Sequence, residues 1–137
     1  MNAAHPTTNY PERREELQSG LIRLGRELPG AMGSFASLHK AATANGALNT
    51  KTKELIALGI AVAIRCDSCI AYHVHDSLAA GATRPEILET LGVAVMMGGG
   101  PSAMYSCDAL AALEQFEVER KELWTAGEIV PFMLAKS

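Results

Sequence analysis

The sequence predicts an all-α fold, a bundle of about six helices that forms a single domain over residues 1–137. Apolar residues recur at spacings of three and four, as in Leu17, Leu21, Leu24 and Leu28, and this pattern indicates a helix with one apolar face. Runs that alternate β-branched and polar residues, which are typical of strands, are nearly absent. A chain of 137 residues fits one domain and buries roughly two-thirds of its unfolded surface without disulfides.

The first two helices are expected to follow a loose N-terminal arm over residues 1–11, which is rich in Pro, Thr and Asn. The first helix should begin near Pro11 and continue until Pro29–Gly30 interrupts it. The second should end near Asn45–Gly46. Its predicted buried face consists of Met32, Phe35, Leu38 and Ala42.

The middle of the chain predicts two helices that meet at a pair of cysteines. Thr50 is the expected N-cap of a helix over residues 51–65. This helix is apolar on nearly all sides after its first turn, which indicates a helix buried in the core. Asp67 or Ser68 is expected to cap the next helix, and Gly81 is expected to end it.

Two further helices complete the predicted bundle. The segment from Thr83 to Glu86 has an N-cap Thr, a Pro in the first turn and a Glu at the capping-box position. This helix should reach Met97, and Gly98–Gly100 should either end it or let two backbones approach. The sixth helix should cover residues 102–124. The fourth and fifth helices are expected to form a central helical hairpin. Three methionines are expected in the core or in a subunit interface: Met96, Met97 and Met104.

Composition excludes several classes of protein. The formal net charge is −3 with a pI of about 5.8, so no basic excess exists to neutralise nucleic-acid phosphates. The longest apolar stretch, residues 55–64, is about half of a membrane span. The N-terminus lacks the apolar core of a signal peptide, so the sequence predicts a cytoplasmic protein without a membrane partner. Its three cysteines are an odd number, which does not fit a secreted disulfide framework and favours catalytic or metal-binding thiols.

The residues that carry chemistry are grouped around a C-x-x-C pair, Cys66 and Cys69, at a predicted helix start. His73 follows Cys69 by four residues, so the three side chains should point the same way from one helix. The helix N-terminus favours a thiolate, which is the nucleophilic form of cysteine, and the imidazole can take the thiol proton. Glu54 comes from the preceding helix, and its carboxylate could orient the imidazole if the chain turns back sharply near Arg65.

Less specific interpretations of these residues remain open. The cysteines could be two small buried hydrophobic residues, or they could bind structural zinc together with His73 and a fourth ligand that the sequence does not supply. Glu54 could simply be an acid in a first helical turn, where the helix dipole favours it. Three other residues are interpreted as structural. His39 is expected to be an ordinary helix residue, His75 a helix residue on the surface, and Cys107 a buried cysteine.

The chain resembles the alkylhydroperoxidase D-like branch of the carboxymuconolactone decarboxylase superfamily. That branch is marked by Glu, eleven residues, Cys, any residue, Cys or Ser, Cys, three residues and His. Glu54, Cys66, Ser68, Cys69 and His73 match every position. The stretch TRPEILETLGVAVMMGGGPSAMYSCDALAAL resembles the late helices of the family, and the resemblance covers roughly residues 30 to 115.

The resemblance implies an alkylhydroperoxidase D-like helical bundle, assembly into homotrimers or homohexamers, and a disulfide cycle that needs no cofactor and no metal. The substrate would be a hydroperoxide or a disulfide, and an external thiol or protein reductant would restore the pair. Cys69 would react with peroxide and Cys66 would resolve, although the helix dipole alone favours Cys66 as the more acidic thiol. His73 and Glu54 would form the proton relay.

One departure from the family affects the expected activity. Peroxidase members often carry a second His where this chain has Ser68, which can pass a proton but cannot hold one near neutral pH. Thiol-dependent peroxidase or disulfide reductase chemistry is therefore the leading hypothesis. The alternatives are a redox-sensing or scaffold protein without turnover, and a cofactor-free decarboxylase-like enzyme, against which both cysteines argue.

Overall fold

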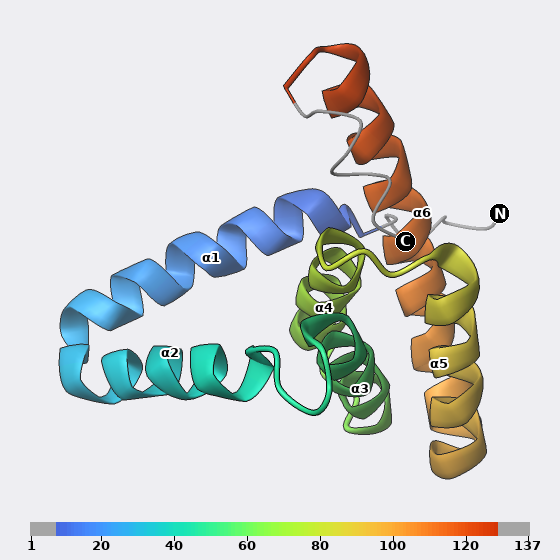
Figure 1. Cartoon of the computed structure of the whole chain (residues 1–137), viewed down its shortest axis with the longest axis horizontal. Coiled ribbons are helices and arrows are strands. Elements are labelled where there is room, and N and C mark those ends of the chain that lie inside the picture. Colours follow the sequence, from blue (N-terminus) through green and yellow to red (C-terminus); the bar gives the residue numbers. More distant parts are fainter. Residues whose placement is uncertain (1–7, 129–137) are drawn as a thin grey trace, which may run out of the picture.

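The computed structural model describes residues 8–128, and this part of the chain is all-α, without a strand (Figure 1). The predicted fold class is therefore confirmed. The helices are α1 (Tyr10–Glu27), α2 (Pro29–Thr43), α3 (Thr50–Ala63), α4 (Asp67–Ala79), α5 (Arg84–Gly98) and α6 (Gly100–Thr125).

Four helices, α3 to α6, form the packed body of the molecule. α3 packs against both α4 and α5, and α6 packs against the same two helices. The expected hairpin of the fourth and fifth helices is wrong, because α4 and α5 hardly contact each other; the hairpins are α3–α4 and α5–α6. The core between the four helices is aliphatic with one aromatic ring. Its largest fully buried apolar side chains are Phe116, Leu58, Ile70, Ile87, Leu113, Val62 and Val74.

The first two helices form an arm that extends away from this body (Figure 1). α1 touches α4 and α6, while α2 has only a small contact with α3. The expected burial of apolar faces here is wrong for the single chain: no residue of α2 is buried, and Phe35 and Leu38 are 58% and 64% exposed. An antiparallel pair of helices has too little mutual surface to cover both of its apolar stripes.

The start of α1 corrects the expected loose arm. Residues 1–7 lie outside the described part of the chain, but helix α1 already begins at Tyr10, which is only 3% exposed. Asn9 caps the helix by accepting the backbone N–H of Glu12, and the Tyr10 N–H donates to Gln115 on α6 at 2.8 Å. The first turn of α1 is therefore fixed to the body rather than loose.

The helix caps show which of the predicted capping residues are correct. The capping box between Thr83 and Glu86 is present in full, as the sequence predicts. Asn49, not Thr50, caps α3, because the Asn49 side chain reaches the Thr52 N–H while Thr50 is already helical. No helix among the described residues is long and apolar enough to cross a membrane.

Candidate redox site

One backbone reversal, between α3 and α4, brings the candidate site together. α3 ends in a Schellman motif, in which the Cys66 N–H donates to the Ala61 carbonyl and the Arg65 N–H to the Val62 carbonyl. Arg65 occupies the C′ position with a φ of 61°, an unusual conformation for a residue with a side chain. The chain therefore turns back sharply at Arg65, as the sequence requires if the two helices are to share a site.

The cysteine pair occupies the first turn of α4. Cys66 is itself the N-cap, and its Sγ accepts the backbone N–H of Cys69 at 3.2 Å. Neither Asp67 nor Ser68 caps the helix, so both expected caps are wrong. The two sulfurs are joined in a disulfide with the Cα atoms 5.1 Å apart. The pair lies at the positive end of the helix, which favours a thiolate once the disulfide is reduced.

A glutamate–histidine pair lies one turn further along α4. The Nδ1 atom of His73 is 2.8 Å from Oε2 of Glu54, which projects from α3. Glu54 is only 3% exposed, while the His73 side chain keeps 19% of its surface accessible. A carboxylate bound to Nδ1 selects the neutral tautomer that carries its proton there, which leaves Nε2 free to take a proton. The predicted proximity of Glu54 and His73 is confirmed.

Helix α1 contributes contacts that sequence analysis did not predict. An Nη atom of Arg13 donates to the Ser68 hydroxyl at 3.3 Å, within the C-x-x-C segment. Arg14 lies 3.7 Å from the Asp76 carboxylate and its guanidinium stacks on the ring of Tyr72 at 5.1 Å. These contacts join residues 55 to 62 positions apart, and no local spacing in the sequence signals them.

An acidic cluster, formed by Asp67 and Asp108, lies beside Tyr10 at the docked start of α1. Burial, together with the nearby Asp108 and Asp67 carboxylates and a hydrogen bond with Asp67, raises the pKa of Tyr10 to about 12. Burial, followed by repulsion from Asp67, raises the pKa of Asp108 above its ordinary value. Asp67 stands between the two cysteines in the chain, so negative charge adjoins the pair on this side.

A second group of metal-type ligands adjoins the Glu54–His73 pair. Ligand atoms of His39, Glu54 and Asp76 all lie within 4.8 Å of one another. Both carboxylates already have partners. Glu54 contacts His73. Asp76 contacts His75 at 2.9 Å and also pairs with Arg14. A disulfide also withholds the cysteine sulfurs from a metal, so the zinc interpretation with Cys66 and Cys69 does not describe this state of the protein.

The structure corrects the predicted burial of five further residues. His75 is half-buried rather than on the surface, because its ring packs edge-on against Phe116 with ring centres 5.4 Å apart. Cys107 was expected to be buried but is exposed, since it lies on an outer face of α6. Met96, Met97 and Met104 are also exposed, so the core interpretation of these residues is wrong for the single chain.

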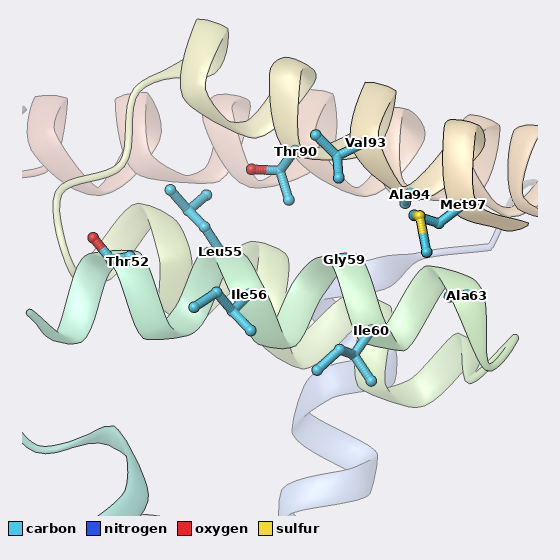
Figure 2. A pocket seen from close by; sticks show the side chains of 10 residues that line it. All are labelled: Thr52, Leu55, Ile56, Gly59, Ile60, Ala63, Thr90, Val93, Ala94 and Met97. Atoms are coloured by element: carbon cyan, nitrogen blue, oxygen red, sulfur yellow. The ribbon is translucent and has the colours of Figure 1, made fainter. Parts of the chain in front are cut away.

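An apolar groove on the surface is separate from these residues. A groove of about 420 Å³ runs between α3 and α5, and Figure 2 shows its lining side chains. None of the four principal candidates, Glu54, Cys66, Cys69 and His73, lines it. The candidate residues therefore lie outside this groove, and Cys66, Cys69 and His73 are half-buried at the start of α4.

Comparison with known proteins agrees with the fold and the site, which define an all-α protein with paired thiols at a helix N-terminus. The sequence pattern of the carboxymuconolactone decarboxylase family matches residues 29–114, more than half of the chain. The chain therefore belongs to this family.

Three relatives illustrate the match. An uncharacterised protein of Cupriavidus necator is 42% identical over 105 residues, which cover 77% of this chain and 93% of the relative. The family protein lpg0406 of Legionella pneumophila is 48% identical, with a TM-score of 0.76 over 78% of this chain and 96% of that one. TM1620 of Thermotoga maritima, whose description suggests a possible role in an antioxidative response, is 34% identical. Its TM-score is 0.64 over 67% of this chain and 95% of that one.

Proposed function

We propose that the protein is a thiol-dependent peroxidase or disulfide reductase of the alkylhydroperoxidase D-like type, with Cys66 and Cys69 as its redox pair. The observation that carries the proposal is the bonded cysteine pair at the start of α4, with the Glu54–His73 pair one turn away. The antioxidative role suggested for TM1620 supports the same chemistry. His73 and Glu54 act as the proton relay in this proposal, and Ser68 is a candidate member of that relay.

The proposed cycle starts from the reduced pair. The ionised sulfur of Cys69 attacks the terminal oxygen of a hydroperoxide, the O–O bond breaks, and the alcohol leaves with a proton from the His73 relay. The sulfenic acid formed on Cys69 is attacked by the Cys66 thiolate, so the disulfide forms and water leaves. An external dithiol then returns two electrons through a mixed disulfide. Protein groups alone perform each step, with no cofactor.

The order of the two cysteines follows the family resemblance, and one contact favours the reverse. The backbone N–H of Cys69 points to Cys66 Sγ, which favours negative charge on Cys66. Single variants decide between the two orders. If Cys69 reacts first, Cys66→Ser accumulates a sulfenic acid on Cys69 that dimedone labels. Labelling of Cys66 in Cys69→Ser, with none in Cys66→Ser, would reverse the order.

Turnover separates an enzyme from a sensor. The reduced protein is mixed with cumene hydroperoxide and excess dithiothreitol, and the remaining peroxide is followed with time. We expect sustained consumption by the wild type and by Cys107→Ser, and only the uncatalysed rate in the Cys66→Ser/Cys69→Ser variant. A single stoichiometric oxidation without turnover would indicate a redox sensor. A lactone decarboxylation that survives the double variant would indicate the cofactor-free enzyme instead.

We also propose that copies of this chain assemble through the arm and the α3–α5 groove, as trimers or hexamers. Both surfaces are apolar and stay accessible among residues 8–128: Phe35 and Leu38 on α2, and Ile60 and Met97 at the groove, are more than half exposed. Their combined extent matches a homo-oligomer interface better than a ligand pocket. Light scattering should give a mass of three or six chains, and Phe35→Glu should shift it toward the monomer.

Localisation follows from the same chemistry. A thiol pair that turns over needs a compartment where dithiol reductants are kept reduced, which favours the cytoplasm. Fractionation with a reporter for each compartment tests this placement.

A further inference from the structure

Arg13 is the cation with a direct hydrogen bond to the cysteine segment. Its guanidinium donates to Ser68 Oγ at 3.3 Å, and Ser68 directly precedes Cys69. Arg13 is half-buried, and its Nε atom is shielded from solvent without a hydrogen-bond acceptor among the described residues. A partly desolvated guanidinium with an unused donor is favourable only beside negative charge.

The electrostatic surroundings of the cysteine pair explain why such a cation matters. Charged and titratable groups reach this region from four directions. They are Arg13, Arg14 and Tyr10 on α1, Glu54 and Arg65 at the two ends of α3, Asp67 and His73 on α4, and Asp108 on α6. The carboxylates of Asp67 and Asp108 oppose a thiolate, so the positive end of α4 is partly cancelled.

The serine at position 68 gains a role from this contact. Because the Arg13 guanidinium occupies a lone pair of the Ser68 oxygen, the hydroxyl proton is free to be donated to an adjacent anion. A hydroxyl bound to a guanidinium is a stronger donor than an isolated one. An arginine–serine pair can thereby supply the positive charge that a protonated histidine would supply at this position.

We propose that Arg13 is a positioning residue for the thiol chemistry: acting through Ser68, it stabilises the ionised form of the reduced Cys66–Cys69 pair. This inference rests on the proposed redox function. The family model covers residues 29–114, so Arg13 lies outside the matched range. The docked first turn of α1, held at Tyr10, keeps the guanidinium in place.

The test measures ionisation and needs no turnover, so its failure is distinct from failure of the enzymatic proposal. The full-length reduced protein is alkylated with iodoacetamide across a pH series, and each cysteine peptide is quantified by mass spectrometry. The exposed Cys107 serves as a reference in the same molecule. We expect Arg13→Gln to raise the midpoint of the more reactive cysteine of the pair by about one pH unit, with Cys107 unchanged.

Three further variants separate local charge from other effects. Arg23→Gln removes the same charge from the exposed, distal part of α1, and its midpoint should equal that of the wild type. Arg13→Lys should restore most of the shift, since it keeps the charge. Ser68→Ala keeps every charge but removes the hydroxyl that accepts from Arg13, and it should raise the midpoint by a smaller amount. This variant also tests the contact if Arg13→Gln fails to fold. A folded Arg13→Gln protein that titrates like the wild type would overturn the proposal.

Discussion

The imidazole of His73 and the carboxylate of Glu54 lie 2.8 Å apart although nineteen positions separate them in the chain. The contact exists because α3 and α4 pack against each other after the reversal at Arg65. A buried acid bound to the Nδ1 of a half-exposed histidine orients the ring and leaves Nε2 toward the accessible side. The proposed proton relay therefore depends on one hydrogen bond between two helices.

Glu54→Gln should lower kcat/KM for hydroperoxide by about 10²-fold or more, because the amide no longer enforces the tautomer that leaves Nε2 basic. Glu89→Gln removes the same charge from an exposed site on α5 and should leave the rate unchanged. The measurement is peroxide consumption with dithiothreitol. Equal rates in the two variants would exclude Glu54 from the relay.

Tyr10→Phe should weaken the docking of α1. At neutral pH we expect a loss of about 1.5 kcal/mol of unfolding free energy, because Asp67 loses a buried hydrogen-bond donor. The sign of the pH dependence follows from a folded pKa of about 12 against the ordinary tyrosine pKa of 10.0 in the unfolded chain. The unfolded state ionises first, so Tyr10 contributes full stability below pH 10 and loses it as the pH rises toward 12.

The Tm of the wild type should therefore fall more steeply than that of Tyr10→Phe between these two pH values. Thermal unfolding followed by circular dichroism across the range measures the difference. Parallel curves would mean that the Tyr10 hydroxyl is not held in the buried environment described here.

Gly98→Ala should destabilise the α5–α6 junction by about 1–3 kcal/mol. A Cβ at this position would lie 1.7 Å from the Ser102 hydroxyl, and Ser102 is only 1% exposed, so a buried side chain must move. Gly100→Ala is the matched control because a Cβ there meets nothing within 4 Å. Urea denaturation compares the two variants. The prediction fails if both unfold at the same midpoint.

Arg65→Val should cost about 1–2 kcal/mol, because a β-branched residue is strained at a φ of 61°. In Arg65→Gly, the glycine adopts this conformation without strain. Its greater conformational entropy in the unfolded chain offsets part of the stability gained in this way. We expect Gly to be tolerated and Val to lower both the Tm and the rate of peroxide consumption, since the reversal positions Cys66. Equal stability of the two variants would contradict this account of the turn.

Local signals in the sequence predicted the helices well. The capping box at Thr83 and Glu86 depends on four consecutive residues, and it is present as expected. The cap of α3 was misplaced by one residue, because Asn49 and Thr50 are both good capping residues and only the tertiary path of the preceding loop selects one.

Predictions of burial failed where they depended on partners outside the helix. The periodicity of Phe35 and Leu38 indicates an apolar face, but it cannot say whether that face meets this chain or another copy. The exposed methionines of α5 and α6 have the same ambiguity. Packing between helices, and not the sequence pattern within them, decides whether these residues are buried.

The candidate site was predicted only in its local part. Cys66, Cys69 and His73 share one helix, so their spacing places them together. Glu54 joins them only because the chain turns back at Arg65, which spacing alone could not establish. Arg13 reaches the site because α1 docks on α4, a long-range contact that no spacing reveals.

The most direct test of the central claim is mass spectrometry of the fully reduced protein before and after one equivalent of hydroperoxide. The account predicts that the peptide containing Cys66 and Cys69 loses the mass of two hydrogen atoms as the disulfide forms, while the Cys107 peptide stays unmodified. Both cysteines remaining as free thiols while peroxide persists, or oxidation confined to Cys107, would contradict a redox pair at this helix.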